Sequence, residues 1–238
     1  MNNPDVFQFK GFDVVQGNSG LKVNSDAVII ASWFKPKPTD KILDIGCGTG
    51  VISCILSKRF PEAKIDGIDI DKNAQEASLT SFAKHPNAKN LRLIPGDFRD
   101  FTCDEPYDSV VCNPPYFNYH LDDDSSRNTA RQQGYLNLKE LFAGINRVLS
   151  KSGTCAIIVP RRLKEECEFL GLQENLYLVA ELIFTGSMQK PFNHCVLLFK
   201  RQYQPFASDI LIMFEMDGSP TPSYQKLVGD LYAQMPKR

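Results

Sequence analysis

The residue types with the clearest chemistry lie in a glycine-rich turn, Asp44 to Gly50, with the sequence DIGCGTG. An apolar run over 41–45 precedes this turn, and a segment with helical apolar spacing over 51–60 follows it, so the pattern predicts a strand, a turn and a helix. Glycines there let the backbone turn tightly and let a ligand approach it closely. A dinucleotide fingerprint, G-x-G-x-x-G, would need its third glycine at position 51, and Val51 at that place argues against NAD.

Three acidic residues stand at or just after predicted strand ends. Asp44 lies where a carboxylate would repel a pyrophosphate but would suit the ammonium of a methionine moiety. Asp69 ends the next strand, and its carboxylate can accept hydrogen bonds from both hydroxyls of a ribose. After a third strand, Asp97 can accept the exocyclic amine of an adenine, and Phe98 can pack on the ring. In this order, the features resemble the class I S-adenosylmethionine-dependent methyltransferases.

A second motif, Asn113-Pro114-Pro115-Tyr116-Phe117, follows the fourth predicted strand. Two successive prolines fix φ, remove two N–H donors and hold the segment extended. The backbone carbonyls and the Asn113 amide oxygen therefore present acceptors at the carboxyl end of the sheet, where open α/β folds bind their ligands.

Such acceptors suit the methylation of an amine whose lone pair is delocalised into a ring or carbonyl. If the amine donates its two hydrogens to Asn113 and to the Pro114 carbonyl, its nitrogen gains sp³ character and its lone pair points at a sulfonium methyl. Catalysis would then rest on positioning and on preorganised polar groups. Tyr116 adds an aromatic face on which a flipped base can stack. The motif resembles the Asn-Pro-Pro-Tyr signature of amino-methyltransferases that act on adenine, guanine or glutamine amides.

A narrower resemblance runs nearly end to end. Segments 7–10, 21–26, 113–117 and 127–131 are similar to those of the bacterial tRNA1(Val) adenine-N6-methyltransferases. This resemblance implies S-adenosylmethionine as the cofactor and adenine 37, beside the anticodon of a tRNA, as the acceptor. It implies a cofactor site made by Asp44, Gly46, Gly48, Asp69, Ile70, Asp97, Phe98 and Asn113. It implies that Asn113, Pro114, Pro115 and Tyr116 form the transfer site and that Tyr116, Phe117, Arg127 and Arg131 contact the substrate.

Other functions stay open on the residues alone. The acceptor amine can belong to an rRNA guanine, a DNA adenine or a protein glutamine, and a binding module that holds RNA without turnover is a different class. A cysteine attacking a pyrimidine is disfavoured because Cys112 ends an apolar strand and Cys103 has no nearby base in sequence. His120 beside the acidic run 122–124 is best interpreted as part of a solvated polar loop over 118–134.

Basic residues that can hold tRNA phosphates are scattered along the chain. They are Lys22, Lys35, Lys37, Arg127, Arg131, Arg161, Arg162, Lys164, Lys200 and Arg201. Several follow strands, so we expect them to share the edge that carries Asn113 and to form one patch.

The elements that position these residues alternate between strands and helices. Strands are expected over 41–45, 64–69, 91–94, 108–112 and 154–159, with helices over 51–60, 72–84, 136–149 and 161–170, and a late strand pair over 176–184 and 195–200. This order predicts an α/β, Rossmann-like, doubly wound, mostly parallel sheet of seven strands with a late antiparallel strand. We expect one domain over 1–238: an extension of strands and a helix over 1–38, a core over 39–205, and a tail with a helix over 206–238.

Composition limits the remaining possibilities. The chain has 238 residues and a formal charge of -1, so any nucleic-acid site must be local and not a property of bulk charge. Its seven cysteines lack Cys-x-x-Cys spacing and its three histidines are far apart, which predicts no metal site and mostly buried thiols. The start of the chain shows no secretory signal and no apolar run reaches membrane-spanning length, so we expect a cytoplasmic, monomeric protein with no protein partner.

Overall fold

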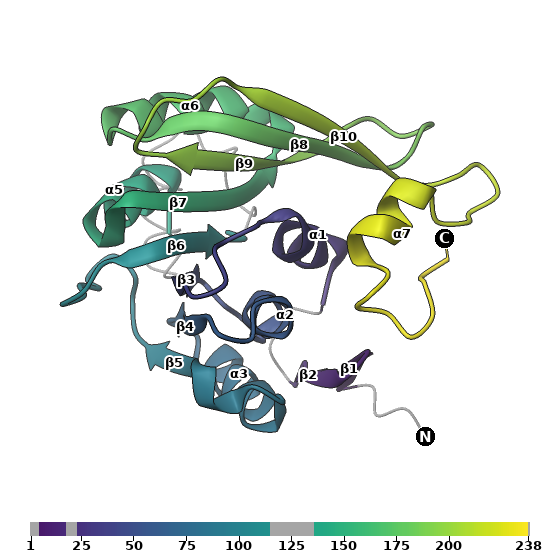
Figure 1. The fold of residues 1–238 in the computed structure, drawn as a ribbon, viewed down its shortest axis with the longest axis horizontal. Coiled ribbons are helices and arrows are strands. Elements are labelled where there is room, and N and C mark those ends of the chain that lie inside the picture. Colours follow the sequence, from purple (N-terminus) through teal and green to yellow (C-terminus); the bar gives the residue numbers. More distant parts are fainter. Residues whose placement is uncertain (1–4, 18–22, 115–135, 238) are drawn as a thin grey trace, which may run out of the picture.

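A computed structural model describes residues 5–17, 23–114 and 136–237, and places one large sheet between two layers of helices (Figure 1). The elements in chain order are β1 Val6–Phe9, β2 Phe12–Val15, α1 Ser25–Trp33, β3 Lys41–Ile45, α2 Val51–Arg59, β4 Lys64–Asp69, α3 Lys72–Lys84, η1 Ala88–Asn90, β5 Leu91–Pro95, β6 Tyr107–Cys112, α5 Leu138–Val148, β7 Leu149–Pro160, η2 Arg161–Leu163, α6 Lys164–Gln173, β8 Tyr177–Ser187, β9 His194–Lys200, β10 Ala207–Phe214 and α7 Pro222–Val228.

The strands of the large sheet follow the order β10-β8-β9-β7-β6-β3-β4-β5, and β1 and β2 form a separate hairpin. The five strands from β3 to β7 pair in parallel, and β9 runs antiparallel between β7 and β8. The predicted α/β, doubly wound, mostly parallel architecture with a late antiparallel strand is therefore confirmed.

The sheet has eight strands, one more than expected, because β10 pairs in parallel with β8. This strand lies in the segment 206–238, which was expected to be a tail with a helix. Its first four residues are exposed at the sheet edge and its apolar residues are concentrated in the second half. A strand that is buried over only half its length shows too little alternation to be found from the sequence.

Each face of the sheet carries its own hydrophobic core. One core packs α1, α2 and α7 against the sheet, and it draws residues from the N-terminal, central and C-terminal parts of the chain, such as Val14, Ile55 and Tyr224. The other packs α5 and α6 on the opposite face. Because the first core includes all three predicted segments, the extension and the tail are integral to the fold.

Helix α1 begins one residue after its cap. The side chain of Asn24 accepts a hydrogen bond from the Ala27 N–H at 2.9 Å, so Asn24 is the cap. The helix is buried over 27–32 and ends before Pro36.

Within the described residues, no helix combines the length and the apolar character that crossing a membrane requires.

Candidate active site

The sheet register brings the predicted site residues to one edge. Ile45 of β3 lies beside Ile68 of β4 and Cys112 of β6, and Asp69 lies beside Pro95 of β5. The residues at or just past this level therefore meet at the carboxyl edge of the parallel strands: Gly46, Asp69, Gly96 and Asn113. Open α/β sheets bind their ligands at this edge.

The glycine turn depends on left-handed backbone conformations. Gly46, Gly48 and Gly50 have φ values of 66°, 56° and 80°, a region that favours glycine. A Cβ at Gly46 would meet no atom of the described residues within 4 Å, so this part of the structure leaves the space in front of the turn open. A Cβ at Gly50 would lie 2.5 Å from the ring of Phe82. Gly46 thus keeps the ligand side clear, whereas Gly50 lets α2 approach α3.

Asp44 is buried beneath this turn. Its Oδ2 accepts hydrogen bonds from the Ser53 N–H at 3.1 Å and the Ser53 Oγ at 2.7 Å, in the first turn of α2. The N-cap residue of α2, Gly50, has no side chain, so Asp44 caps the helix from the neighbouring strand. Its Oδ1 is buried without a hydrogen-bond partner in the described part of the chain. Burial raises the pKa of Asp44 to about 7, against the hydrogen bonds from Ser53, which lower it.

Asp69 fixes the turn from the adjacent strand. Its Oδ2 accepts the Gly48 N–H at 2.7 Å, and its Oδ1 accepts the Asp71 N–H at 2.9 Å. Each carboxylate oxygen has a second lone pair, so a pair of ribose hydroxyls can still bond to Asp69. Burial raises the pKa of this carboxyl. Ile70, the next residue, is 49% exposed at the same edge, where it offers an apolar surface to a ligand.

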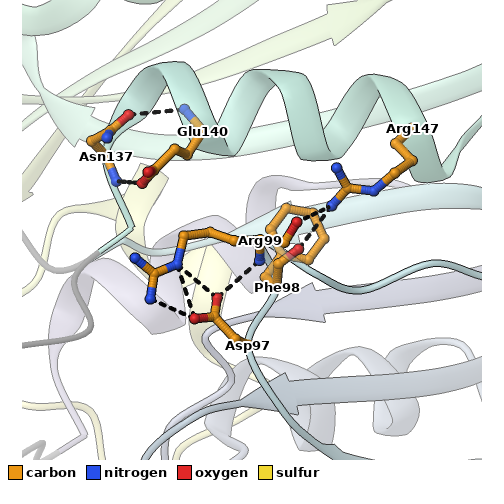
Figure 2. Close-up of polar contacts among 6 residues, drawn as sticks. All are labelled: Asp97, Phe98, Arg99, Asn137, Glu140 and Arg147. Carbon is orange, nitrogen blue, oxygen red and sulfur yellow. Dashed lines mark hydrogen bonds and ion pairs between the residues drawn. The ribbon is translucent and has the colours of Figure 1, made fainter. Parts of the chain in front are cut away.

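Asp97 and Phe98 occupy different environments (Figure 2). Asp97 is half-buried, and Arg99 donates to it through its backbone N–H and its guanidinium. Phe98 is only 5% exposed and lies in the core under α5, where a Cβ at Gly144 would come within 2.4 Å of its ring. The placement of Phe98 therefore differs from the expectation that its ring packs on an adenine, and its observed role is to anchor the loop to the core.

Arg99 is the site residue that the sequence interpretation missed. The only available signal was an acid and an arginine two residues apart in Gly-Asp-Phe-Arg. Such a pair is common on surfaces and does not by itself indicate a contact.

The transfer motif is described only at its start. Asn113 is half-buried and Pro114 is buried, directly after β6 and beside the glycine turn. The other predicted residues of the transfer site and substrate contacts lie outside the described residues: Pro115, Tyr116, Phe117, Arg127 and Arg131. The loop predicted over 118–134 lies there too.

Four of the ten residues expected to form the basic patch lie at the opposite edge, and Lys22, Arg127 and Arg131 lie outside the described residues. Arg161 and Arg162 are exposed in η2, directly after β7, at the same edge as Asn113. Lys164 follows them but forms an ion pair with the buried Glu181 at 2.7 Å. The expectation is wrong for the residues at the opposite edge: Lys35 and Lys37, which precede the start of β3, and Lys200 and Arg201, which end the antiparallel β9.

Cysteine chemistry is not supported. Six of the seven thiols are buried, which confirms the prediction of mostly buried cysteines, and all seven are free thiols. Burial raises the pKa of Cys112 well above its usual range and also raises that of Cys103. A thiol with a raised pKa is a poor nucleophile near neutral pH. No cluster of three or more metal-ligating side chains occurs in the described ranges.

These features fit S-adenosylmethionine. The unpartnered Oδ1 of Asp44 can receive an ammonium, and the open space in front of Gly46 admits a ligand close to the backbone. Asp69 keeps acceptor capacity for two hydroxyls, and Ile70 is exposed beside it. The described edge thus presents groups for the amino-acid part and the ribose of one molecule.

Several known proteins are similar to this chain. The profile of the methyltransferase small domain family matches residues 18–182. A tRNA1(Val) (adenine(37)-N6)-methyltransferase of Vibrio campbellii is 30% identical over 230 residues, covering 96% of each chain. One of Bacteroides fragilis with the same name is 28% identical, over 99% of this chain and 100% of its own. A solved structure of a predicted O-methyltransferase of Agrobacterium tumefaciens superimposes with a TM-score of 0.69 at 15% identity, covering 88% of this chain and 98% of that one.

The buried Asp44 predicts a pH dependence of stability in the ligand-free protein. Its folded pKa is about 7, above the unfolded value of about 3.9. The unfolded state therefore ionises first, and the stability contributed by the protonated form is lost as pH rises from about 4 to about 7. We expect the free energy of unfolding of the wild type to fall relative to that of Asp44→Asn over this range, measured by urea denaturation. Parallel curves for the two proteins would show that Asp44 is already ionised in the fold.

Proposed function

This chain belongs to the methyltransferase small domain family, and we propose that it methylates N6 of an adenine in tRNA, namely adenine 37 in the anticodon loop of tRNA1(Val). Relatives with that name match nearly its full length, which supports the choice of substrate. The observation that carries the proposal is the position of Asn113 and Pro114. Both follow β6 directly, beside the glycine turn of β3, at the edge where a cofactor can reach them.

The cofactor half of the site is made by residues of β3, β4 and the loop after β5. S-adenosylmethionine supplies an electrophilic methyl group on a sulfonium sulfur. In the proposal, Asp44 receives its ammonium, Gly46 and Gly48 admit it close to the backbone, and Asp69 holds the ribose. Ile70 covers the adenine ring, and Asp97 accepts a hydrogen bond from the adenine amine.

The acceptor half performs the positioning. Asn113 and the Pro114 carbonyl accept the two hydrogens of the target amine, so the nitrogen becomes pyramidal and its lone pair points at the methyl group. Pro115 keeps this segment extended. Tyr116 and Phe117 give the flipped base aromatic surfaces, and an anticodon-loop base is cheaper to flip than a paired one.

Contacts to the tRNA backbone come from arginines near the same edge. Arg161 and Arg162 are exposed there, and we assign Arg127 and Arg131 to the same task. Several phosphate contacts suffice for a chain whose net charge is close to zero, because the patch is local. We further propose that the enzyme acts as a monomer in the cytoplasm, where its tRNA is found, over the single domain 1–238.

Transfer of labelled methyl tests the proposed reaction. We expect the wild type to move label from S-adenosylmethionine into tRNA that lacks the host's own N6 mark, with the label recovered as N6-methyladenosine from one tRNA. Label in methylguanosine, in DNA or in a protein glutamine would show that the acceptor is that group and not a tRNA adenine. Cofactor binding with no transfer to any of these would favour the RNA-binding module.

Replacing Asn113 separates binding from transfer. We expect Asn113→Ala to keep cofactor affinity within a few-fold and to reduce turnover by about 10²–10³, as for the loss of one preorganised polar contact. Single-turnover transfer and calorimetric binding measure the two quantities. Asn90→Ala, which alters η1 before the start of β5, is a matched control and should leave both unchanged. If Asn113→Ala turned over as fast as the wild type, Asn113 would not position the target amine.

The salt dependence of tRNA binding tests the arginines. Each lost phosphate contact should make the slope of log K against log salt shallower by about 0.7. We therefore expect a change of about 1.4 for the double variant Arg161→Ala and Arg162→Ala. The double variant Lys35→Ala and Lys37→Ala, at the opposite edge, should keep the wild-type slope. Equal slopes in all three proteins would place the tRNA elsewhere.

A further inference from the structure

The guanidinium of Arg99 holds Asp97 in one orientation (Figure 2). Its Nε donates to both carboxylate oxygens, at 3.0 Å to Oδ1 and 2.9 Å to Oδ2, and its Nη2 donates to Oδ2. The backbone N–H of Arg99 adds a bond to Oδ1 at 2.9 Å. The two side chains are only 25% and 23% exposed, so solvent screens this ion pair less than one on the open surface.

The backbone beneath this pair is fixed from behind. Arg147, in the last turn of α5, donates to three carbonyls of the loop: Phe101 at 2.8 Å, Phe98 at 2.9 Å and Arg99 at 3.0 Å. The Phe98 ring packs on Gly144 of the same helix. These hydrogen bonds restrain both the backbone of the loop and the side chain of Asp97.

The hydrogen bonds from Arg99 leave the Asp97 carboxylate able to act only as a hydrogen-bond acceptor toward a ligand. An ionised carboxylate only accepts, at about four lone-pair sites, and three N–H groups of Arg99 already use most of them. The same bonds lower the pKa of Asp97, so the carboxyl does not become a donor near neutral pH. What remains is an acceptor with a set direction at the ligand edge.

We propose that Arg99 is a specificity-determining residue that makes the site select a 6-aminopurine cofactor and reject a 6-oxopurine one. An amino group at C6 donates to the fixed acceptor, whereas a carbonyl oxygen there would face it with a second acceptor. Without Arg99, the carboxylate can rotate away and the two purines become nearly equivalent. The inference rests on the proposed function, because it requires Asp97 to face the adenine of S-adenosylmethionine.

Calorimetric binding of two product analogues tests the proposal without turnover. S-adenosylhomocysteine carries the 6-amino group, whereas S-inosylhomocysteine carries a 6-oxo group and a hydrogen on N1, with the same ribose and amino-acid part. We expect the wild type to bind the adenosine compound at least about tenfold more tightly. In Arg99→Met, the affinity for the adenosine compound should fall and the ratio of the two affinities should shrink to within about threefold. Arg99→Gln is a second variant in case the first fails to fold.

The chain offers a matched control. Arg92 makes a similar two-pronged contact with Asp66, with bonds of 2.9 and 2.6 Å, near the start of β5 and away from the ligand edge. Arg92→Met should therefore keep the wild-type affinity ratio. Equal binding of both compounds by the wild type, or an unchanged ratio in both Arg99 variants, would overturn this inference alone. Failure of the wild type to bind S-adenosylhomocysteine would overturn it together with the proposed function.

Discussion

A buried carboxylate beneath a glycine turn is the constraint on which the active edge depends. The turn needs glycines because its backbone is left-handed at three positions, so the helix that follows begins at a residue with no capping side chain. Asp44 supplies the missing cap from β3, and Asp69 bonds the middle of the turn from β4. These hydrogen bonds hold the turn in its conformation from both strands. The cost is a carboxyl group with one buried oxygen that has no hydrogen-bond partner among the described residues, and we assign the ammonium of the cofactor to this oxygen.

The three carboxylates of the edge have been given different properties by their surroundings. Burial raises the pKa values of Asp44 and Asp69, whereas the guanidinium of Arg99 lowers that of Asp97. A carboxyl with a raised pKa can be stabilised in its charged form by a bound cation. A carboxyl with a lowered pKa stays ionised and remains a hydrogen-bond acceptor. One residue type can therefore serve an ammonium, a pair of hydroxyls and an aromatic amine along a single molecule.

The sequence predicted the parts of this protein that rest on local periodicity. The alternation of apolar strands and helices gave the α/β sheet, and the turn Asp44 to Gly50 was found because glycine spacing is a local property. The errors concern direction and contact. Lys200 is the last residue of a strand, but that strand runs antiparallel, which the local sequence pattern does not reveal. Phe98 and Arg99 are adjacent, yet one enters the core and the other stays at the edge, because Gly144 from a distant helix leaves room for the ring.

In the proposed site, the Oδ1 of Asp44, which has no hydrogen-bond partner among the described residues, receives the ammonium of the cofactor, and proton release on binding reports this pairing. Calorimetric titration of S-adenosylhomocysteine at pH 6, repeated in buffers with different heats of ionisation, gives the number of protons exchanged. With its pKa of about 7, Asp44 is mostly protonated at this pH in the free protein and must ionise to pair with an ammonium. We therefore expect the wild type to release about one proton and Asp44→Asn to release none. Binding by the wild type without proton release would contradict this pairing.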